Sequence, residues 1–206
     1  MLAQRFATDH PGVEVRVTTE GSATLVEQLR GGAPIDVLIT ADAATMDRAG
    51  SHVTAPITIA WNEPVVIVSP QSRGSIRGLD DLDGAVIAVC SLSQPCGAAA
   101  ERLLATRPGV TPATLEPHVQ SVVTKVALGE ADAGVAYRTD ALANPELGVI
   151  MFDAPPLAVT GAVTSTASSQ AQALLDFLSS SAATSAWEQA GYVVRMPKAY
   201  PVYDDA

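Results

Sequence analysis

Three short stretches of the sequence place a small or polar residue at the expected start of a helix. They cover residues 21–24, 94–97 and 117–121. The first turn of a helix has backbone N–H groups without intrahelical partners and carries the positive end of the helix dipole. Each start is therefore a candidate anion site, although most capped helix starts bind nothing. In the first stretch, Ser22 or Thr24 is expected to cap the helix, and Thr24 and Glu27 have the spacing of a capping box.

Cys90 and Cys96 are the only cysteines in the chain. The residues alone leave three interpretations open. A disulfide would close a small loop, stabilise the fold by roughly 2 kcal/mol and indicate an oxidising compartment. A reactive Cys96 thiolate at a helix start would be a nucleophile, but the three histidines provide no local Cys/His signature for its base. Two unpaired buried thiols are the third interpretation. A metal site is not indicated, because the cysteines and histidines lack ligand spacing.

Tyr137 is expected at the carboxyl end of a strand over residues 133–137. Open α/β sheets place ligand-binding groups at this end of their strands, although tyrosine is also an ordinary strand-end residue. The sequence contains no G-x-S-x-G, Walker A or G-x-G-x-x-G motif. The residues give no positive indication of catalysis, so we expect a binding protein rather than an enzyme.

Strand-like and helix-like runs alternate along the chain, which is the pattern of an α/β protein with largely parallel sheets. The expected strands cover residues 13–19, 35–40, 64–69, 85–90, 133–137, 148–152 and 157–164, and the expected helices cover residues 24–30, 97–106, 119–128 and 168–189. Turn-rich stretches at residues 71–75 and 153–156 suit two α/β lobes that are joined by crossing strands and have a cleft between them.

The beginning of the chain has the pattern of the second half of a helix. Leu2, Phe6 and the polar residues between them form this pattern, which ends at the His-Pro-Gly of residues 10–12. A helix that lacks its first turns indicates missing upstream sequence, so we expect a truncated start. The first ten residues also lack the basic, apolar and small-residue regions of a signal peptide, and no export signal is expected in this chain.

Composition limits the kinds of partner that the protein can bind. The chain has 206 residues, of which 48% are hydrophobic, and its 12 Lys and Arg against 22 Asp and Glu give a formal net charge of -10. Nucleic-acid binding needs a basic surface, which this chain does not readily provide. No apolar run approaches the roughly 20 residues that cross a bilayer. We therefore expect a globular protein that binds neither nucleic acid nor membrane.

Seven stretches, taken in order along the chain, resemble the periplasmic molybdate-binding proteins, which are the solute receptors of molybdate ABC importers. They are HPGVEV at residues 10–15, GSATLVEQL at 21–29, GAPIDVLITAD at 32–42, QPCGAAA at 94–100, VVTKVALGEADAGVAYRTD at 122–140, LLDFL at 174–178 and WEQAGY at 187–192. The similarity extends from about residue 4 to residue 195. Single stretches also occur in other binding proteins, and their order and spacing indicate this family.

The resemblance implies a two-lobed α/β fold of the type II periplasmic-binding-protein class, with molybdate or tungstate held in the cleft between the lobes. We expect residues 1–62 and 159–206 to form the first lobe and residues 63–158 to form the second. The resemblance implies no cofactor besides the ligand and no metal cation, since molybdenum is bound as its oxyanion.

The family holds the oxyanion with neutral hydrogen-bond donors. Carried onto this sequence, the resemblance assigns these roles to the hydroxyls of Ser22 and Tyr137 and to the backbone N–H groups of Cys96 and Val119. It also likens Cys90 and Cys96 to the cysteine pair of a family variant with a disulfide beside the site. Three of these positions coincide with the helix starts described above, and Tyr137 coincides with the strand end.

The chain departs from the family at its beginning. The family begins with a central strand and a small-residue segment with a further Ser donor, whereas this chain begins inside the next helix. The expectation is either a misassigned start or a non-functional truncated copy with reduced stability and affinity. The resemblance further implies a monomeric, exported protein, periplasmic or otherwise extracytoplasmic, with a lipid anchor where the full-length form carries one. Such a protein delivers its ligand to the membrane permease of a molybdate ABC transporter.

Three other functions are compatible with parts of the sequence. A receptor for another oxyanion or a small organic anion would use the same kind of site. The effector domain of a cytoplasmic transcriptional regulator has the same two-lobed architecture, but the sequence has no helix-turn-helix segment and a disulfide is expected. An enzyme with Cys96 as its nucleophile would need that thiol to be free.

Overall fold

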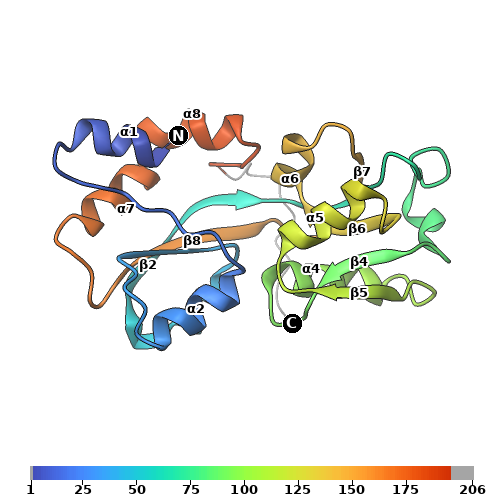
Figure 1. The fold of residues 1–206 in the computed structure, drawn as a ribbon, viewed down its shortest axis with the longest axis horizontal. Helices are drawn as coiled ribbons and strands as arrows, with labels where there is room; N and C mark the ends of the chain where they lie inside the picture. The colour runs from blue at the N-terminus through green and yellow to red at the C-terminus, as the bar shows by residue number, and fades with distance from the viewer. Residues whose placement is uncertain (1, 196–206) are drawn as a thin grey trace. The chain divides into compact units, whose positions relative to one another are not determined.

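The computed structural model describes residues 2–195 and divides the chain into two units. Unit 1 comprises Met1–Trp61 and Leu157–Ala206, and unit 2 comprises Asn62–Pro156 (Figure 1). The predicted divisions between the lobes fall after residues 62 and 158, and the divisions in the structure fall after Trp61 and Pro156. Each unit has its own sheet and its own buried side chains, so each is described by itself.

Unit 1 is built on a three-stranded sheet in the order β1-β8-β2, in which β1 runs antiparallel to β8. Its strands are β1 (Val37–Thr40), β2 (Val53–Asn62) and β8 (Leu157–Thr164). Its helices are α1 (Leu2–Asp9), α2 (Ser22–Arg30), α3 (Ala43–Asp47), the 3-10 turn η1 (Gly50–His52), α7 (Ala171–Ser179) and α8 (Ser181–Gln189). Leu38 packs with α2 and α3, whereas its neighbours Val37 and Ile39 pack with α7, so these helices cover opposite faces of the sheet.

Unit 2 is built on a five-stranded sheet in the order β5-β4-β6-β3-β7. Its strands are β3 (Pro64–Val68), β4 (Ile87–Cys90), β5 (Pro112–Glu116), β6 (Ala133–Tyr137) and β7 (Gly148–Met151). Its helices are the 3-10 turn η2 (Leu79–Leu82), α4 (Pro95–Ala105), α5 (Val119–Leu128) and α6 (Arg138–Ala143). The predicted strands over 64–69, 85–90, 133–137 and 148–152 and the predicted helices over 97–106 and 119–128 are confirmed here, with shifts of a few residues at their ends.

The five-stranded sheet is mixed and β1 and β8 of the three-stranded sheet are antiparallel, so the expectation of largely parallel sheets is wrong. β4 runs parallel to β5 and β6, but β3 runs antiparallel to β6 and β7, and β1 runs antiparallel to β8. The parallel strands are the ones joined through α4 and α5, because a helical crossover returns the chain in its original direction. Between β3 and β4 there is no α-helix, so no helical crossover returns the chain to the direction of β3.

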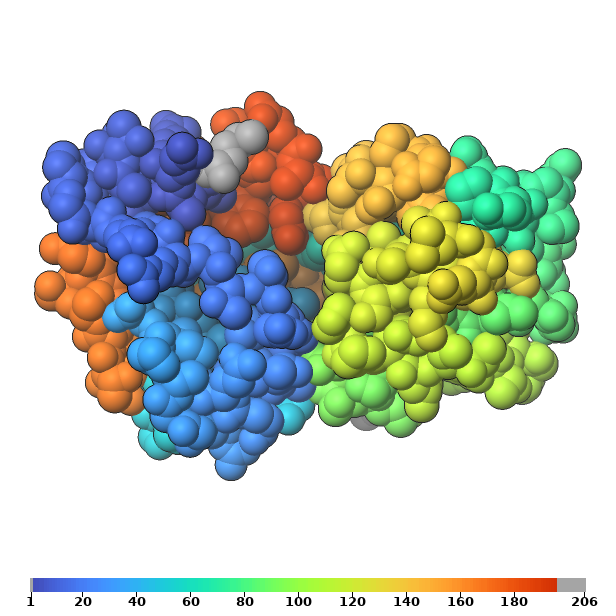
Figure 2. Space-filling model, viewed as in Figure 1, coloured from blue at the N-terminus to red at the C-terminus, as the bar shows by residue number. Residues whose placement is uncertain are grey.

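The helices α4 and α5 cover opposite faces of the unit 2 sheet. Leu103 of α4 belongs to the same buried cluster as Val89 of β4. Val122 of α5 instead lies against Gly134 of β6, where an added Cβ would be 2.6 Å from the Val122 Cγ1 atom. The chain moves one way across the sheet from β4 to β5 and the other way from β5 to β6, so two right-handed crossovers place their helices on opposite faces. Figure 2 shows α5 at the surface of unit 2.

Residues 13–19 are not a strand, although their valines alternate with polar residues. The segment between α1 and α2 has no ladder partner in residues 2–195, and Val17 is 70% exposed. Alternation predicts which residues suit a strand, but a strand exists only where another strand accepts its backbone hydrogen bonds. The helix expected over 168–189 is likewise two helices, α7 and α8, because Ser180 has extended backbone (ψ 163) and its hydroxyl accepts a hydrogen bond from the Ala182 N–H.

Candidate functional site

Three neighbouring parallel strands of unit 2 end at one edge of the sheet. Cys90 ends β4, Glu116 ends β5 and Tyr137 ends β6, in the sheet order β5-β4-β6. Because these strands run in the same direction, the starts of α4 and α5 follow the same edge of the sheet, where Tyr137 ends β6. The Ser91 N–H donates to the Glu116 carbonyl over 2.8 Å, which ties the loop after β4 to the end of β5. The topology therefore brings together three of the four predicted site residues: Cys96, Val119 and Tyr137.

The first turn of α4 presents one unpaired backbone donor in the part of the chain that the structure describes. Pro95 has no N–H, and the N–H groups of Gly97 and Ala98 donate to the Gln94 carbonyl over 2.9 and 3.2 Å. The Cys96 N–H is left at the second position of the helix, where no intrahelical acceptor exists. This is the donor that the resemblance assigns to the oxyanion.

Cys90 and Cys96 form a disulfide, which confirms the pairing implied by the resemblance. Their Cα atoms are 5.6 Å apart, and the two residues are 0% and 4% exposed. The bond joins the last residue of β4 to the first turn of α4. A free Cys96 nucleophile is therefore excluded in this structure, since neither cysteine is a free thiol.

The first turn of α5 leaves two backbone donors. His118 is the N-cap, and its Nδ1 accepts the Ser121 N–H over 3.2 Å. The N–H groups of Val119 and Gln120 lie ahead of the intrahelical ladder, and neither has a partner among residues 2–195. No acidic residue lies in the first turn of α4 or α5, where Asp and Glu commonly occupy the positive end of the dipole. Both helix starts thus remain available to an external anion.

Tyr137 is 5% exposed and continues directly into α6. Its backbone N–H donates to the Asp140 Oδ2 atom over 3.0 Å. Burial raises the pKa of Asp140 to about 6, and the hydrogen bond from Tyr137 opposes this rise. The carboxylate thus fixes the backbone at the residue whose hydroxyl is the predicted oxyanion donor.

Ser22 belongs to unit 1 and is the first residue of α2. The predicted cap by Ser22 or Thr24 and the predicted capping box are wrong, because the N-cap is Gly21 and no side chain caps the helix. Glu27 instead forms an ion pair with Arg30 at 3.2 Å. The Ser22 Oγ accepts the Ala41 N–H over 3.0 Å, at the carboxyl end of β1, and this leaves the hydroxyl hydrogen to donate elsewhere.

Two cations that lie near the unit 2 donors in sequence, Lys125 and Arg138, are paired with carboxylates. The Lys125 Nζ lies 2.7 Å from the Glu116 Oε1, and the hydrogen bond from Lys125 lowers the pKa of the buried Glu116. The Arg138 guanidinium lies 3.2 Å from the Glu63 carboxylate. The arrangement therefore offers neutral N–H and O–H donors to an anion rather than a free positive charge.

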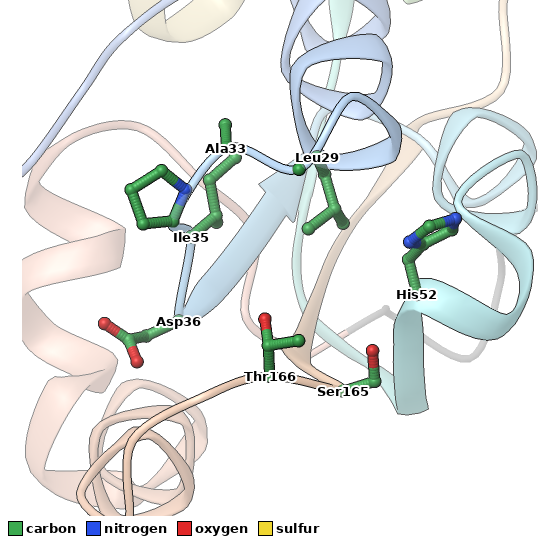
Figure 3. Close-up of a pocket in the computed structure, with 9 residues that line it drawn as sticks. Leu29, Ala33, Ile35, Asp36, His52, Ser165 and Thr166 are labelled. Atoms are coloured by element: carbon green, nitrogen blue, oxygen red, sulfur yellow. The ribbon is translucent and has the colours of Figure 1, made fainter.

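Unit 1 contains a cavity of about 490 Å³ (Figure 3). The cavity lies at the C-terminal end of α2, whereas Ser22 is at the N-terminal end of this helix. Its lining residues are Leu29, Gly32, Ala33, Pro34, Ile35, Asp36, His52, Ser165 and Thr166. The Asp36 carboxylate is already engaged, because it accepts the Ser168 N–H over 2.6 Å. None of the four predicted site residues lines this cavity.

Two searches of residues 2–195 bear on other kinds of function. No group of three or more His, Cys, Asp or Glu side chains in this range is placed to hold a metal ion. In the same range, every helix is too short or too polar to cross a membrane.

Solved structures with the same arrangement define the class of fold. The periplasmic molybdate-binding protein of Azotobacter vinelandii matches with a TM-score of 0.77 at 21% identity, over 95% of this chain and 93% of that chain. The sulfate-binding protein SubI from Mycobacterium tuberculosis H37Rv matches with a TM-score of 0.75 at 18% identity, over 93% of this chain and 80% of that chain. The chain has the type II periplasmic-binding-protein fold.

The family follows from the sequence. The model of the bacterial extracellular solute-binding proteins matches residues 1–193, and the chain belongs to this family. The molybdate-binding protein ModA of Mycobacterium tuberculosis H37Rv is 37% identical over 147 residues, which are 68% of this chain and 56% of that protein. The chain thus spans little more than half the length of the curated relatives that it matches.

Sequence reasoning did not identify several residues that shape the site. Asp140 stands three positions after the residue that precedes α6, the spacing of a capping box, and this signal was available in the sequence. His118 was noted only as part of a helix start, since histidine is not among the usual capping residues. The pairing of Lys125 with Glu116 has no local signal, because β5 was not predicted.

Proposed function

We propose that this protein is an extracytoplasmic solute receptor that captures molybdate or tungstate and delivers it to the membrane permease of an ABC importer. The proposed donors are the Ser22 and Tyr137 hydroxyls and the Cys96 and Val119 N–H groups. The observation that carries the proposal is that the Cys96 and Val119 N–H groups, which have no partner among residues 2–195, stand at helix starts that follow the sheet edge where Tyr137 ends β6. The 37% identity to ModA over 147 residues supports molybdate as the anion.

Neutral donors suit a tetrahedral dianion. Each charge-assisted hydrogen bond is worth about 1.5–3 kcal/mol, and helix starts add a favourable dipole. Donors without acceptors also disfavour a protonated oxyanion, whose extra proton finds no partner. The net charge of -10 repels anions at long range, but screening limits this repulsion to about 8 Å at physiological salt. Selection between oxyanions of equal charge then depends on the size of the site. We propose that the receptor acts as a monomer and needs no cofactor besides its ligand.

Calorimetric titration of the chain with sodium molybdate, with sodium sulfate as the control, tests the proposal. We expect one-to-one binding of molybdate and a much weaker response to sulfate. Ser22→Ala and Tyr137→Phe each remove one donor, and each is expected to weaken molybdate binding by about tenfold, which corresponds to about 1.4 kcal/mol. Ser165→Ala and Tyr192→Phe are matched controls outside the proposed site and should leave the affinity unchanged.

Two results would contradict this proposal in different ways. Unchanged affinity in both Ser22→Ala and Tyr137→Phe would reject the assigned donors, although molybdate would still be the ligand. Tight binding of sulfate and weak binding of molybdate would favour a receptor for another oxyanion. The sulfate-binding protein SubI is an example of such a receptor with the same fold. Absence of heat with both anions would reject oxyanion capture by this chain.

A further inference from the structure

We propose that the Cys90–Cys96 disulfide is a positioning element of the oxyanion site: it holds the Cys96 N–H in the orientation that the anion requires. The inference rests on the proposed function, because it concerns one of the proposed donors. It goes beyond a stabilising role, since it assigns to the bond a direct effect on affinity.

The donor belongs to the same residue as one of the bonded sulfur atoms. Cys96 supplies its backbone N–H to the site and its side chain to the disulfide, and its Cα lies 5.6 Å from the Cα of Cys90. Cys90 is fully buried at the end of β4, a strand flanked by β5 and β6 on its two sides. The disulfide therefore connects the donor to the buried end of a strand, where Cys90 pairs with Glu116 of β5.

A second contact fixes the same turn from the other side. An added Cβ at Gly97 would lie 2.0 Å from the Ser91 carbonyl oxygen and 3.0 Å from the Cys90 carbonyl oxygen. The start of α4 thus rests directly on the backbone that follows β4, with no room for a side chain between them. With the disulfide present, the first turn of α4 cannot move away from this backbone without also moving Cys90.

The hydrogen bonds of the turn do not replace this restraint. Gly97 and Ala98 both donate to the Gln94 carbonyl, and the Gln94 N–H donates to the Ser91 carbonyl over 3.0 Å, so these bonds lie within the loop and the first turn. The disulfide adds a covalent link from this turn to the end of β4. A donor held in place before binding loses less entropy when the anion arrives, so its orientation contributes to affinity. We expect loss of the disulfide to weaken molybdate binding by about tenfold.

The test compares two variants that both lower stability. Cys90→Ala/Cys96→Ala removes the covalent link and keeps every backbone donor. Ile87→Ala removes buried methyl groups at the opposite end of the same strand β4, where Ile87 is 3% exposed. Molybdate titrations of the wild type and both variants are made well below their unfolding temperatures, and urea unfolding gives the stability of each.

We expect about tenfold weaker binding in the double variant and unchanged binding in Ile87→Ala. Equal affinity of the double variant and the wild type would overturn the inference, as would an equal loss in both variants, since that loss would follow stability alone. If the double variant does not fold, the wild type is titrated after reduction with dithiothreitol. This dithiol gives two electrons and two protons to the cystine sulfurs and becomes a cyclic disulfide.

A ligand-free measurement separates this inference from the proposed function. Amide hydrogen exchange reports the opening of the first turn of α4 through the N–H groups of Gly97 and Ala98. Faster exchange at these two amides in the double variant than in Ile87→Ala would support the positioning role even if the wild type binds no molybdate. Equal exchange in the two variants would overturn it, whatever the ligand.

Discussion

Asp140 allows a quantitative prediction of how stability depends on pH. Burial raises its pKa to about 6 from the ordinary value of 3.8, against the lowering effect of the Tyr137 N–H. A carboxyl whose pKa is raised by folding adds stability below its ordinary pKa, and this stability is lost as the pH rises through the folded value. At about 1.36 kcal/mol per pKa unit, the rise corresponds to about 3 kcal/mol. Ionised Asp140 should therefore destabilise the protein by about this amount above pH 7, relative to pH 4 or below.

Asp140→Asn removes the ionisation and keeps an oxygen that can accept the Tyr137 N–H. Its stability relative to the wild type should rise by about 3 kcal/mol between pH 3.5 and pH 7.5, with most of the change between pH 4 and pH 6. Urea unfolding followed by circular dichroism measures both proteins across this range. Glu116 and Asp132, whose pKa values are lowered, change stability in the opposite direction, but equally in both proteins.

The control is Asp83→Asn, which alters an exposed carboxylate of the same unit. Its stability relative to the wild type should vary little with pH. A difference between Asp140→Asn and the wild type that stays constant from pH 3.5 to pH 7.5 would refute the reasoning, because it would mean that Asp140 ionises equally easily in the folded and unfolded chains. A difference that shrinks as the pH rises would show that hydrogen bonding outweighs burial.

Two further substitutions test how the helix starts are held. Gly97→Ala places a methyl group 2.0 Å from the Ser91 carbonyl oxygen, so the start of α4 must shift. We expect molybdate affinity to fall at least tenfold in a calorimetric titration. Unchanged affinity would mean that the position of this turn does not affect binding. His118→Ala removes the acceptor for the Ser121 N–H and should lower the free energy of unfolding by about 1 kcal/mol. His118→Asn keeps a side-chain acceptor and should retain most of this stability. An equal loss of stability in both variants would exclude a capping role for His118.

Helices and strands with strong local patterns were predictable from the sequence. The helix α5 was predicted at its observed bounds, because Pro117 stands before it, Gly129 follows it and valines recur along one face. Gly129 has a φ of 74, which explains why the helix ends there. The strand β6 was predicted at its observed bounds for a similar reason, since all of its residues are buried and none is charged.

Elements that depend on distant partners were not predictable in the same way. Residues 13–19 have the composition of a strand and are not one, whereas β5 and β2 are strands whose sequences include prolines and exposed residues. The ladder that makes β5 a strand comes from β4, more than twenty positions earlier in the chain. Local propensity contains no information about such a distant partner, so the wrong strand predictions occur mainly at edge and crossing strands.

The candidate site shows the same division between local and distant information. Local sequence patterns predict that Cys96 and Val119 stand at helix starts, and the structure confirms both positions. The two helix starts follow one sheet edge because the strands are ordered β5-β4-β6, and no single stretch of sequence contains this order. The resemblance to molybdate-binding proteins implies this grouping, whereas local sequence patterns alone do not.

In the proposed site, recognition by neutral dipoles makes geometry more important than charge. A lysine can attract an anion from several directions, but an N–H group donates well only when it points at its acceptor. Here Lys125 is 2.7 Å from the Glu116 carboxylate and so offers little net charge to a ligand. The energy of binding must then come from the alignment of donors such as the Cys96 N–H, and alignment is set by residues that never touch the anion. Cys90 and Gly97 are residues of this kind, and their substitution should weaken binding more than the loss of a surface cation.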